Sequence, residues 1–64
     1  MQGKVKFFDT DRGFGFIGRD AGEDVFVHVS GLQPGTAALT EGQAVEFEVG
    51  PGRKGDEARN VRVI

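Results

Sequence analysis

The chain lacks several residue types, and each absence narrows its possible functions. It has no cysteine, so disulfides and thiolate metal sites are excluded. His28 is the one histidine, and a metal site would need further ligands that no cysteine or second histidine supplies. The sequence also has no apolar run of the length that a signal peptide or transmembrane span requires, so we expect a cytoplasmic protein. We therefore expect no metal, no cofactor and no membrane partner.

The chain is also short and slightly acidic. Its 64 residues suffice for one domain, residues 1–64, and at this size folding hides only about 60% of the surface of the unfolded chain. Such a small core leaves little room for a buried catalytic cleft, so we expect no enzymatic activity. The net charge of −2 by itself argues against a nucleic-acid partner, but the local field depends on where the charges sit.

Eleven glycines and repeated short apolar runs indicate an all-β chain with tight turns. Five strands are expected, at residues 4–8, 13–18, 24–29, 44–49 and 58–63. The longest connection, residues 30–43, would cross over and let the fourth strand join the first three. This pattern predicts a five-stranded antiparallel barrel of the OB type.

Alternation along the expected strands separates a core face from an outer face. The core face carries Ile17, Val25, Val27, Val29, Val45, Phe47, Val49, Val61 and Val63. The opposite face of the two middle strands then carries Phe14, Phe16, Phe26 and His28. A small soluble domain seldom exposes a contiguous aromatic patch without a partner for it. The pattern therefore predicts a binding surface on the second and third strands.

Five segments together resemble the cold-shock domain family, and they span essentially the whole chain. They are residues 4–8, 12–17, 24–28, 41–45 and 58–61. The second of them is similar to the family's first ribonucleoprotein motif, and the end of the third is similar to its second motif. The resemblance implies that single-stranded RNA or DNA, usually rich in pyrimidines, lies across the outer face of the second and third strands.

The residue types suit this function. Every base has a π-face on which an aromatic ring can stack, at about 1–3 kcal/mol per base. Cations beside the rings would contact phosphates, which supplies affinity but little sequence choice. The expected nucleic-acid-binding residues are Lys6, Phe7, Arg12, Phe14, Phe16, Asp24, Phe26, His28 and Lys54. Such a domain would act as a nucleic-acid chaperone that keeps RNA unpaired and thereby influences transcription or translation.

Several of these residues have a second interpretation. The phenylalanines of the middle strands could be core residues, as most phenylalanines are. Phe7 and Phe8 are adjacent and should point opposite ways, and the resemblance favours Phe7 as the outer ring. His28 either stacks on or hydrogen-bonds to a base, or is merely solvated. Asp24 either accepts a hydrogen bond from a base edge or orients a nearby cation.

The chain departs from the family pattern in four places. Phe7 stands where the family commonly has tryptophan, and Val29 where it often has an aromatic residue. The long loop lacks the family's aromatic residue at 35–38, and Asp9 replaces a frequent asparagine. We therefore expect binding that is weaker than usual for the family. The alternative is a structural β-barrel whose aromatic face docks on another protein. A monomer is expected, although strand exchange between copies is conceivable.

Overall fold

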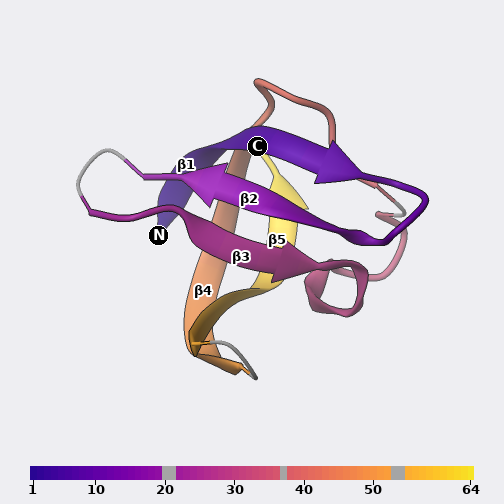
Figure 1. The fold of residues 1–64 in the computed structure, drawn as a ribbon. Coiled ribbons are helices and arrows are strands. Elements are labelled where there is room, and N and C mark those ends of the chain that lie inside the picture. Colours follow the sequence, from indigo (N-terminus) through magenta and orange to yellow (C-terminus); the bar gives the residue numbers. More distant parts are fainter. Residues whose placement is uncertain (20–21, 37, 53–54) are drawn as a thin grey trace.

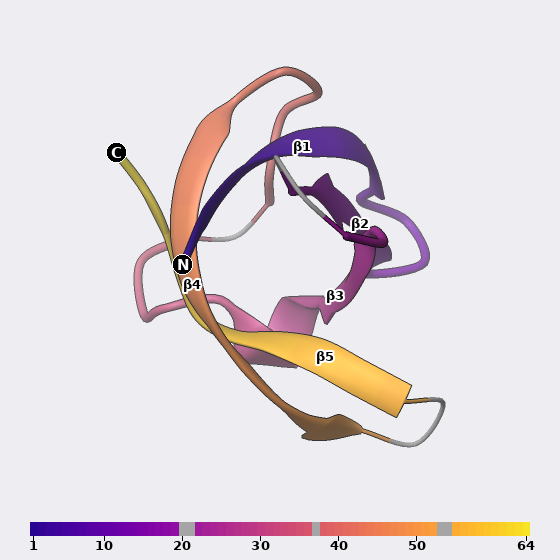
Figure 2. The same ribbon diagram turned by 90° about the vertical axis from the view of Figure 1, so that its left-hand side faces the viewer.

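The computed structural model describes residues 1–19, 22–36, 38–52 and 55–64. Its elements are the strands β1 (Gln2–Asp9), β2 (Phe14–Gly18), β3 (Val25–His28), β4 (Ala44–Gly52) and β5 (Gly55–Val63), with a 3₁₀ turn, η1 (Val29–Gly31), after β3 (Figure 1). The strands close in a ring in the order β1-β2-β3-β5-β4, which Figure 2 shows from one end. The prediction of a five-stranded all-β fold is confirmed.

One junction of the ring is parallel, so the prediction of an antiparallel sheet is wrong. The pairs β1–β2, β2–β3, β1–β4 and β4–β5 are antiparallel, whereas β3 and β5 run in the same direction. The reason is one of parity, because strand directions cannot alternate all the way around a closed ring of five. The crossover needed for a parallel pair is supplied by the chain between β3 and β5, which includes the long connection and β4.

The inside of the ring holds the hydrophobic core. Its buried residues are Val5, Ile17, Val25, Val27, Leu39, Val45, Phe47, Ala58 and Val61. Two residues expected in this core are instead exposed: Val29 (40%) and Val63 (44%). Val29 begins η1, so the strand alternation that would have turned it inward ends at His28. Val63 lies opposite Val45, but it is the last residue of β5, where little of the sheet remains to cover it.

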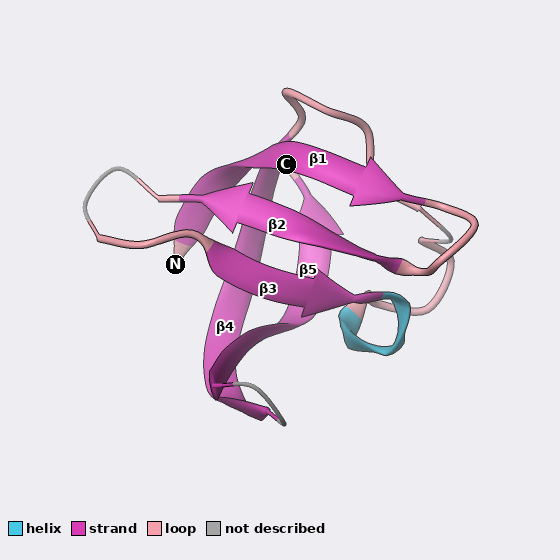
Figure 3. Ribbon diagram, viewed as in Figure 1, coloured by secondary structure: helices cyan, strands magenta, loops and turns pink. Residues whose placement is uncertain are grey.

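Among the described residues, Figure 3 shows helix only at η1, and no helix is long and apolar enough to cross a membrane. Several contacts tie the described loop residues after η1 to the ring. Leu32 forms a bridge with Val61 of β5, and the backbone of Val5 exchanges hydrogen bonds with Gly42 and Gln43. In the described part of the chain, no other element crosses the outer face of β1, β2 and β3 (Figure 1).

Candidate nucleic-acid interface

A β-bulge in β1 turns Phe7 outward and Phe8 inward. Val5, a core residue, lies opposite Ile17. In a regular ladder the next residue, Lys6, would lie opposite Phe16, but Phe7 takes this position instead. β1 therefore contains one extra residue at this point, and the alternation of its faces shifts. Phe7 is 41% exposed, while Phe8 is partly buried against the core. The prediction that Phe7 is the outer ring is confirmed.

Four phenylalanines form a continuous aromatic cluster over β1, β2 and β3. The ring centroid of Phe7 lies 6.2 Å from that of Phe14 and 5.9 Å from that of Phe16. Phe26 closes the cluster, at 5.9 Å from Phe14 and 5.8 Å from Phe16. Such separations are typical of interacting aromatic pairs. We call these four residues the phenylalanine platform.

The phenylalanine platform lies outside the core and faces away from it. Phe14, Phe16 and Phe26 are half-buried because they cover one another, and none of them belongs to the core cluster. The valines and Ile17 on the opposite face of β2 and β3 fill the interior. The alternation that placed these three phenylalanines outside is therefore confirmed, and their interpretation as core residues is not.

His28 lies at the end of β3, opposite Phe14 of the phenylalanine platform. Its Nδ1 accepts a hydrogen bond from the Ser30 backbone N–H at 3.1 Å and lies 2.9 Å from the Ser30 hydroxyl oxygen. Because Nδ1 is an acceptor, the proton of the neutral ring resides on Nε2. The first residues of η1 thus fix the orientation of an exposed ring that can donate a hydrogen bond through Nε2.

Arg12 lies in the turn between β1 and β2, two residues before Phe14 of the platform. An Asp9 carboxylate oxygen accepts hydrogen bonds from the backbone N–H groups of Asp11 and Arg12 at 3.0 and 3.1 Å. This gives Asp9 a structural function in the turn. The Arg12 side chain is 75% exposed and its Nε lies 3.9 Å from the second Asp9 oxygen. Arg12 is therefore placed where it can also reach a ligand.

The structure pairs Lys6 with Asp24, two of the expected contact residues. The Lys6 ammonium nitrogen lies 3.2 Å from Asp24 Oδ1. This contact supports the interpretation of Asp24 as a residue that orients a cation. Lys54, a further expected contact, lies outside the described residues.

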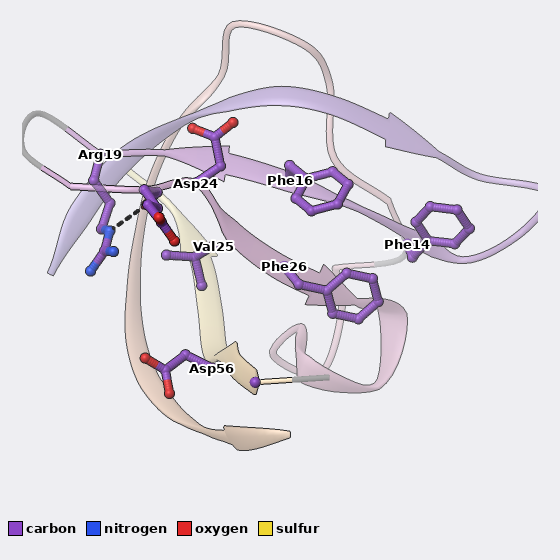
Figure 4. A pocket seen from close by; sticks show the side chains of 9 residues that line it. Phe14, Phe16, Arg19, Asp24, Val25, Phe26 and Asp56 are labelled. Atoms are coloured by element: carbon purple, nitrogen blue, oxygen red, sulfur yellow. Dashed lines mark hydrogen bonds between the residues drawn. The ribbon is translucent and has the colours of Figure 1, made fainter. Parts of the chain in front are cut away.

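A pocket of about 460 Å³ extends the outer face past Phe16 and Phe26 (Figure 4). Its walls include Arg19, Glu23 and Asp56, which the sequence interpretation missed. Arg19 shapes this end of the pocket, since its Nε donates a hydrogen bond to the Glu23 backbone carbonyl at 2.9 Å. Asp56 reaches the pocket because the parallel pairing of β5 with β3 sets the residue after it, Glu57, opposite Phe26. The sequence analysis predicted only antiparallel strand pairs, and it therefore did not place β5 and Asp56 beside β3.

The whole chain, residues 1–64, matches the family model of the 'Cold-shock' DNA-binding domain. The chain belongs to the cold-shock domain family. It is 52% identical to a cold shock-like protein of Thermotoga maritima over 100% of this chain and 98% of that protein. It is also 52% identical to the cold shock protein CspC of Bacillus subtilis and 54% identical to CspA of Staphylococcus aureus. These two alignments cover 95% and 94% of this chain, and 94% and 92% of the relatives.

Membership of the family confirms the resemblance that the five sequence segments carried. Cold-shock domains generally bind nucleic acids and are not enzymes. The platform and the cations beside it are thus the part of this cold-shock domain where a nucleic-acid ligand is to be sought.

Proposed function

We propose that this cold-shock domain binds single-stranded RNA or DNA by stacking unpaired bases on the phenylalanine platform. The observation that carries the proposal is the continuous set of four aromatic rings on the outer face of β1, β2 and β3. Mutual contact holds these rings in place, so a ligand need not order them before stacking. A duplex hides the faces of its bases, and we therefore expect single strands to bind far better.

The charges beside the platform support sequence-tolerant binding. Lys6 precedes Phe7 in β1 and Arg12 lies just before Phe14, and both side chains are well exposed. They offer contacts to phosphates, which are the same in every sequence. Base–aromatic stacking also accepts every base, and modest preferences come from stacking strength and backbone flexibility. We expect a preference for pyrimidine-rich stretches, because pyrimidines stack weakly on one another and separate at low cost.

The cellular consequence follows from mass action. A domain that traps splayed bases shifts RNA from hairpins towards unpaired strands, and it needs no nucleotide hydrolysis to do so. We propose that this chaperone activity influences transcription or translation. The platform has a phenylalanine at position 7 and exposes the aliphatic Val29 beside His28, so we expect weaker binding than in relatives with further aromatic residues.

The proposal is tested by fluorescence-anisotropy titration of a labelled pyrimidine-rich oligonucleotide, single-stranded or in duplex form. Phe16→Ala removes a ring that, like Phe14, contacts both Phe7 and Phe26. We expect it to weaken single-strand binding about 5- to 150-fold, the equivalent of one stacked base. Val63→Ala is the matched control, since it truncates an exposed apolar side chain outside the platform. Its affinity should equal that of the wild type.

Two results would contradict the proposal. If Phe16→Ala and the wild type bind equally, and circular dichroism shows that both are folded, the phenylalanine platform does not bind the bases. Absence of single-strand binding by the wild type would favour the alternative, a surface that docks on another protein. The lack of tryptophan and tyrosine supplies a simple supporting measurement, because strong absorbance of the purified protein near the nucleic-acid maximum would reveal bound RNA.

A further inference from the structure

The second half of β4 has an open edge. β1 pairs with β4 only at Ala44–Glu46, with one further hydrogen bond from the Phe47 backbone N–H to the Met1 carbonyl at 2.8 Å. β4 then continues to Gly52 beside β5 alone, and Figure 2 shows it running away from β1. No strand in the described part of the chain lies beside residues 48–52 on this side. An unpaired strand edge is a template for pairing with another chain.

Two residues of β4 direct their backbone groups towards this open edge. Backbone groups alternate sides along a strand, and the bulge in the β4–β5 ladder adds its extra residue to β5, so the alternation along β4 is unbroken. The groups of Val49 and Pro51 therefore point to the same side as the Phe47 N–H, away from β5. Val49 presents both an N–H and a carbonyl. Pro51 presents a carbonyl alone, because proline has no N–H.

Arg59 of β5 reaches across β4 to the open edge. Its Nη2 donates a hydrogen bond to the Pro51 carbonyl at 2.6 Å, and its side chain is 54% exposed. Gly50 provides the path, since a Cβ atom there would lie 2.6 Å from Arg59 Nε and 2.8 Å from Cδ. The side chain of Arg59 thus lies where any other residue at position 50 would have its own. Pro51 is left with neither a donor nor a free acceptor for another strand.

We propose that Pro51 and Arg59 close the open edge of β4 against a second copy of this chain. The inference concerns self-association and is independent of the proposed function. Two β4 strands paired antiparallel about Gly50 would form a symmetric contact over all of residues 48–52. Glu48 of each copy would lie opposite Gly52 of the other, so no like charges would face each other along the strands. The edge is therefore self-complementary in its side chains.

The backbone of this symmetric contact is where Pro51 and Arg59 act. Each of its hydrogen bonds would join Val49 of one copy to Pro51 of the other. The Val49 carbonyl would need an N–H that Pro51 lacks, and the Val49 N–H would need the carbonyl that Arg59 occupies. The contact would also bring together the two Arg59 guanidinium groups, since each lies over Gly50. Proline and charge are the devices by which proteins protect strand edges.

The test restores both backbone groups at the edge. Pro51→Ala supplies the N–H and Arg59→Ala frees the carbonyl, so we expect the double variant to dimerise. Sedimentation velocity between about 10 µM and about 1 mM should show its mass rising from one chain towards two, whereas the wild type should remain a monomer. Pro51→Ala with Arg62→Ala is the matched control, because Arg62 pairs with Glu46, where β1 covers the edge. Both double variants have the same, more negative net charge, and only the first should dimerise.

A second double variant keeps every charge. Gly50→Ala displaces the Arg59 side chain, and together with Pro51→Ala it should also produce a dimer. It also serves as the test if loss of the Arg59 side chain unfolds the chain, which circular dichroism reveals. Hydrogen exchange at the Val49 amide identifies the surface that is used. This N–H should exchange quickly in the wild type and become protected in the dimers.

Three results would overturn the inference. Folded double variants that both stay monomeric would show that the edge does not pair even when its backbone groups are free. Dimers without protection of the Val49 amide would show that another surface associates. A wild type that dimerises with a protected Val49 amide would show that Pro51 and Arg59 do not close the edge. None of these results depends on whether the phenylalanine platform binds single strands.

Discussion

Gly15 shows how one residue without a side chain permits the outward position of Phe7. It lies buried in β2 opposite Phe8, the phenylalanine that the bulge turns inward. A Cβ atom at Gly15 would come closest to the backbone carbonyl oxygen of Phe7, and it would lie 2.7 Å from Phe8 Cα and 2.9 Å from Phe8 Cδ1, closer than real Cβ contacts come. Phe8 thus occupies the space beside Gly15, and the adjacent Phe7 is left on the platform.

We therefore expect Gly15→Ala to destabilise the fold by about 1–3 kcal/mol, the usual cost of overpacking. Urea unfolding followed by circular dichroism measures the change. Gly18→Ala is the matched control on the same strand, because the three atoms nearest to its added methyl group all belong to the flexible Lys6 side chain. We expect its stability to change by no more than about 0.5 kcal/mol. Equal losses in the two variants would show that close contact with Phe7 and Phe8 of β1 does not set the requirement for glycine.

At the scale of single residues, the sequence predicted correctly which face of a strand most side chains occupy, because alternation sets this. It could not predict contacts between side chains on different strands. Alternation placed Phe14, Phe16 and Phe26 outside, as found. It could not decide whether Asp24 accepts a hydrogen bond from a base or orients a cation. The cation that Asp24 contacts is Lys6 on another strand, and the sequence does not give the distance between them. Alternation also predicted, wrongly, that Val29 points into the core, because the alternating pattern does not show where β3 ends.

The strands themselves were largely predictable, but their ends and partners were not. The expected strands end at residue 49 and resume at residue 58, yet the β4–β5 pairing continues to Pro51 opposite Asp56 and Gly52 opposite Gly55. Glycine and proline normally indicate a turn, but here backbone hydrogen bonds between β4 and β5 continue the two strands through these residues. The direction of β5 relative to β3 depends on closure of the ring, which involves all five strands at once.

The β4–β5 ladder carries a cross-strand ion pair that should make stability depend on pH. Glu46 lies opposite Arg62, and the hydrogen bond and positive charge of Arg62 hold the pKa of the Glu46 carboxyl below its ordinary value of 4.5. A lowered pKa in the folded state stabilises the fold above the ordinary pKa, and this contribution is lost as the pH falls through the folded-state pKa.

Glu46→Gln should therefore lower the melting temperature at neutral pH, and its difference from the wild type should shrink as the pH falls from about 5 towards about 3. Thermal unfolding followed by circular dichroism at a series of pH values measures both. Glu48→Gln serves as control, because the hydrogen-bond partner of Glu48 is the uncharged amide of Asn60, at 3.4 Å. A difference between Glu46→Gln and wild type that stays constant with pH would contradict the assignment.

At the scale of the whole molecule, the strands that form the hydrophobic core also carry the phenylalanine platform. The same β2 and β3 strands supply core residues on one face and the phenylalanine platform on the other. The closure between β3 and β5 then adds Asp56 to the pocket beside the platform. The sequence indicated both faces of each strand, but only the closed ring shows which charges surround the aromatic surface.

If a single strand binds across the phenylalanine platform as proposed, it should stabilise this small domain markedly. Binding to the folded state alone contributes about 2.7 kcal/mol at a ligand concentration of one hundred times the dissociation constant. For a domain of this size we expect the melting temperature to rise by about 10–20 °C with a pyrimidine-rich single strand. The duplex at the same concentration should raise it far less. Phe16→Ala, with its 5- to 150-fold weaker binding, should lose from about a third to about nine-tenths of the rise. Equal shifts with single strand and duplex would mean that phosphates, and not stacked bases, supply the binding energy.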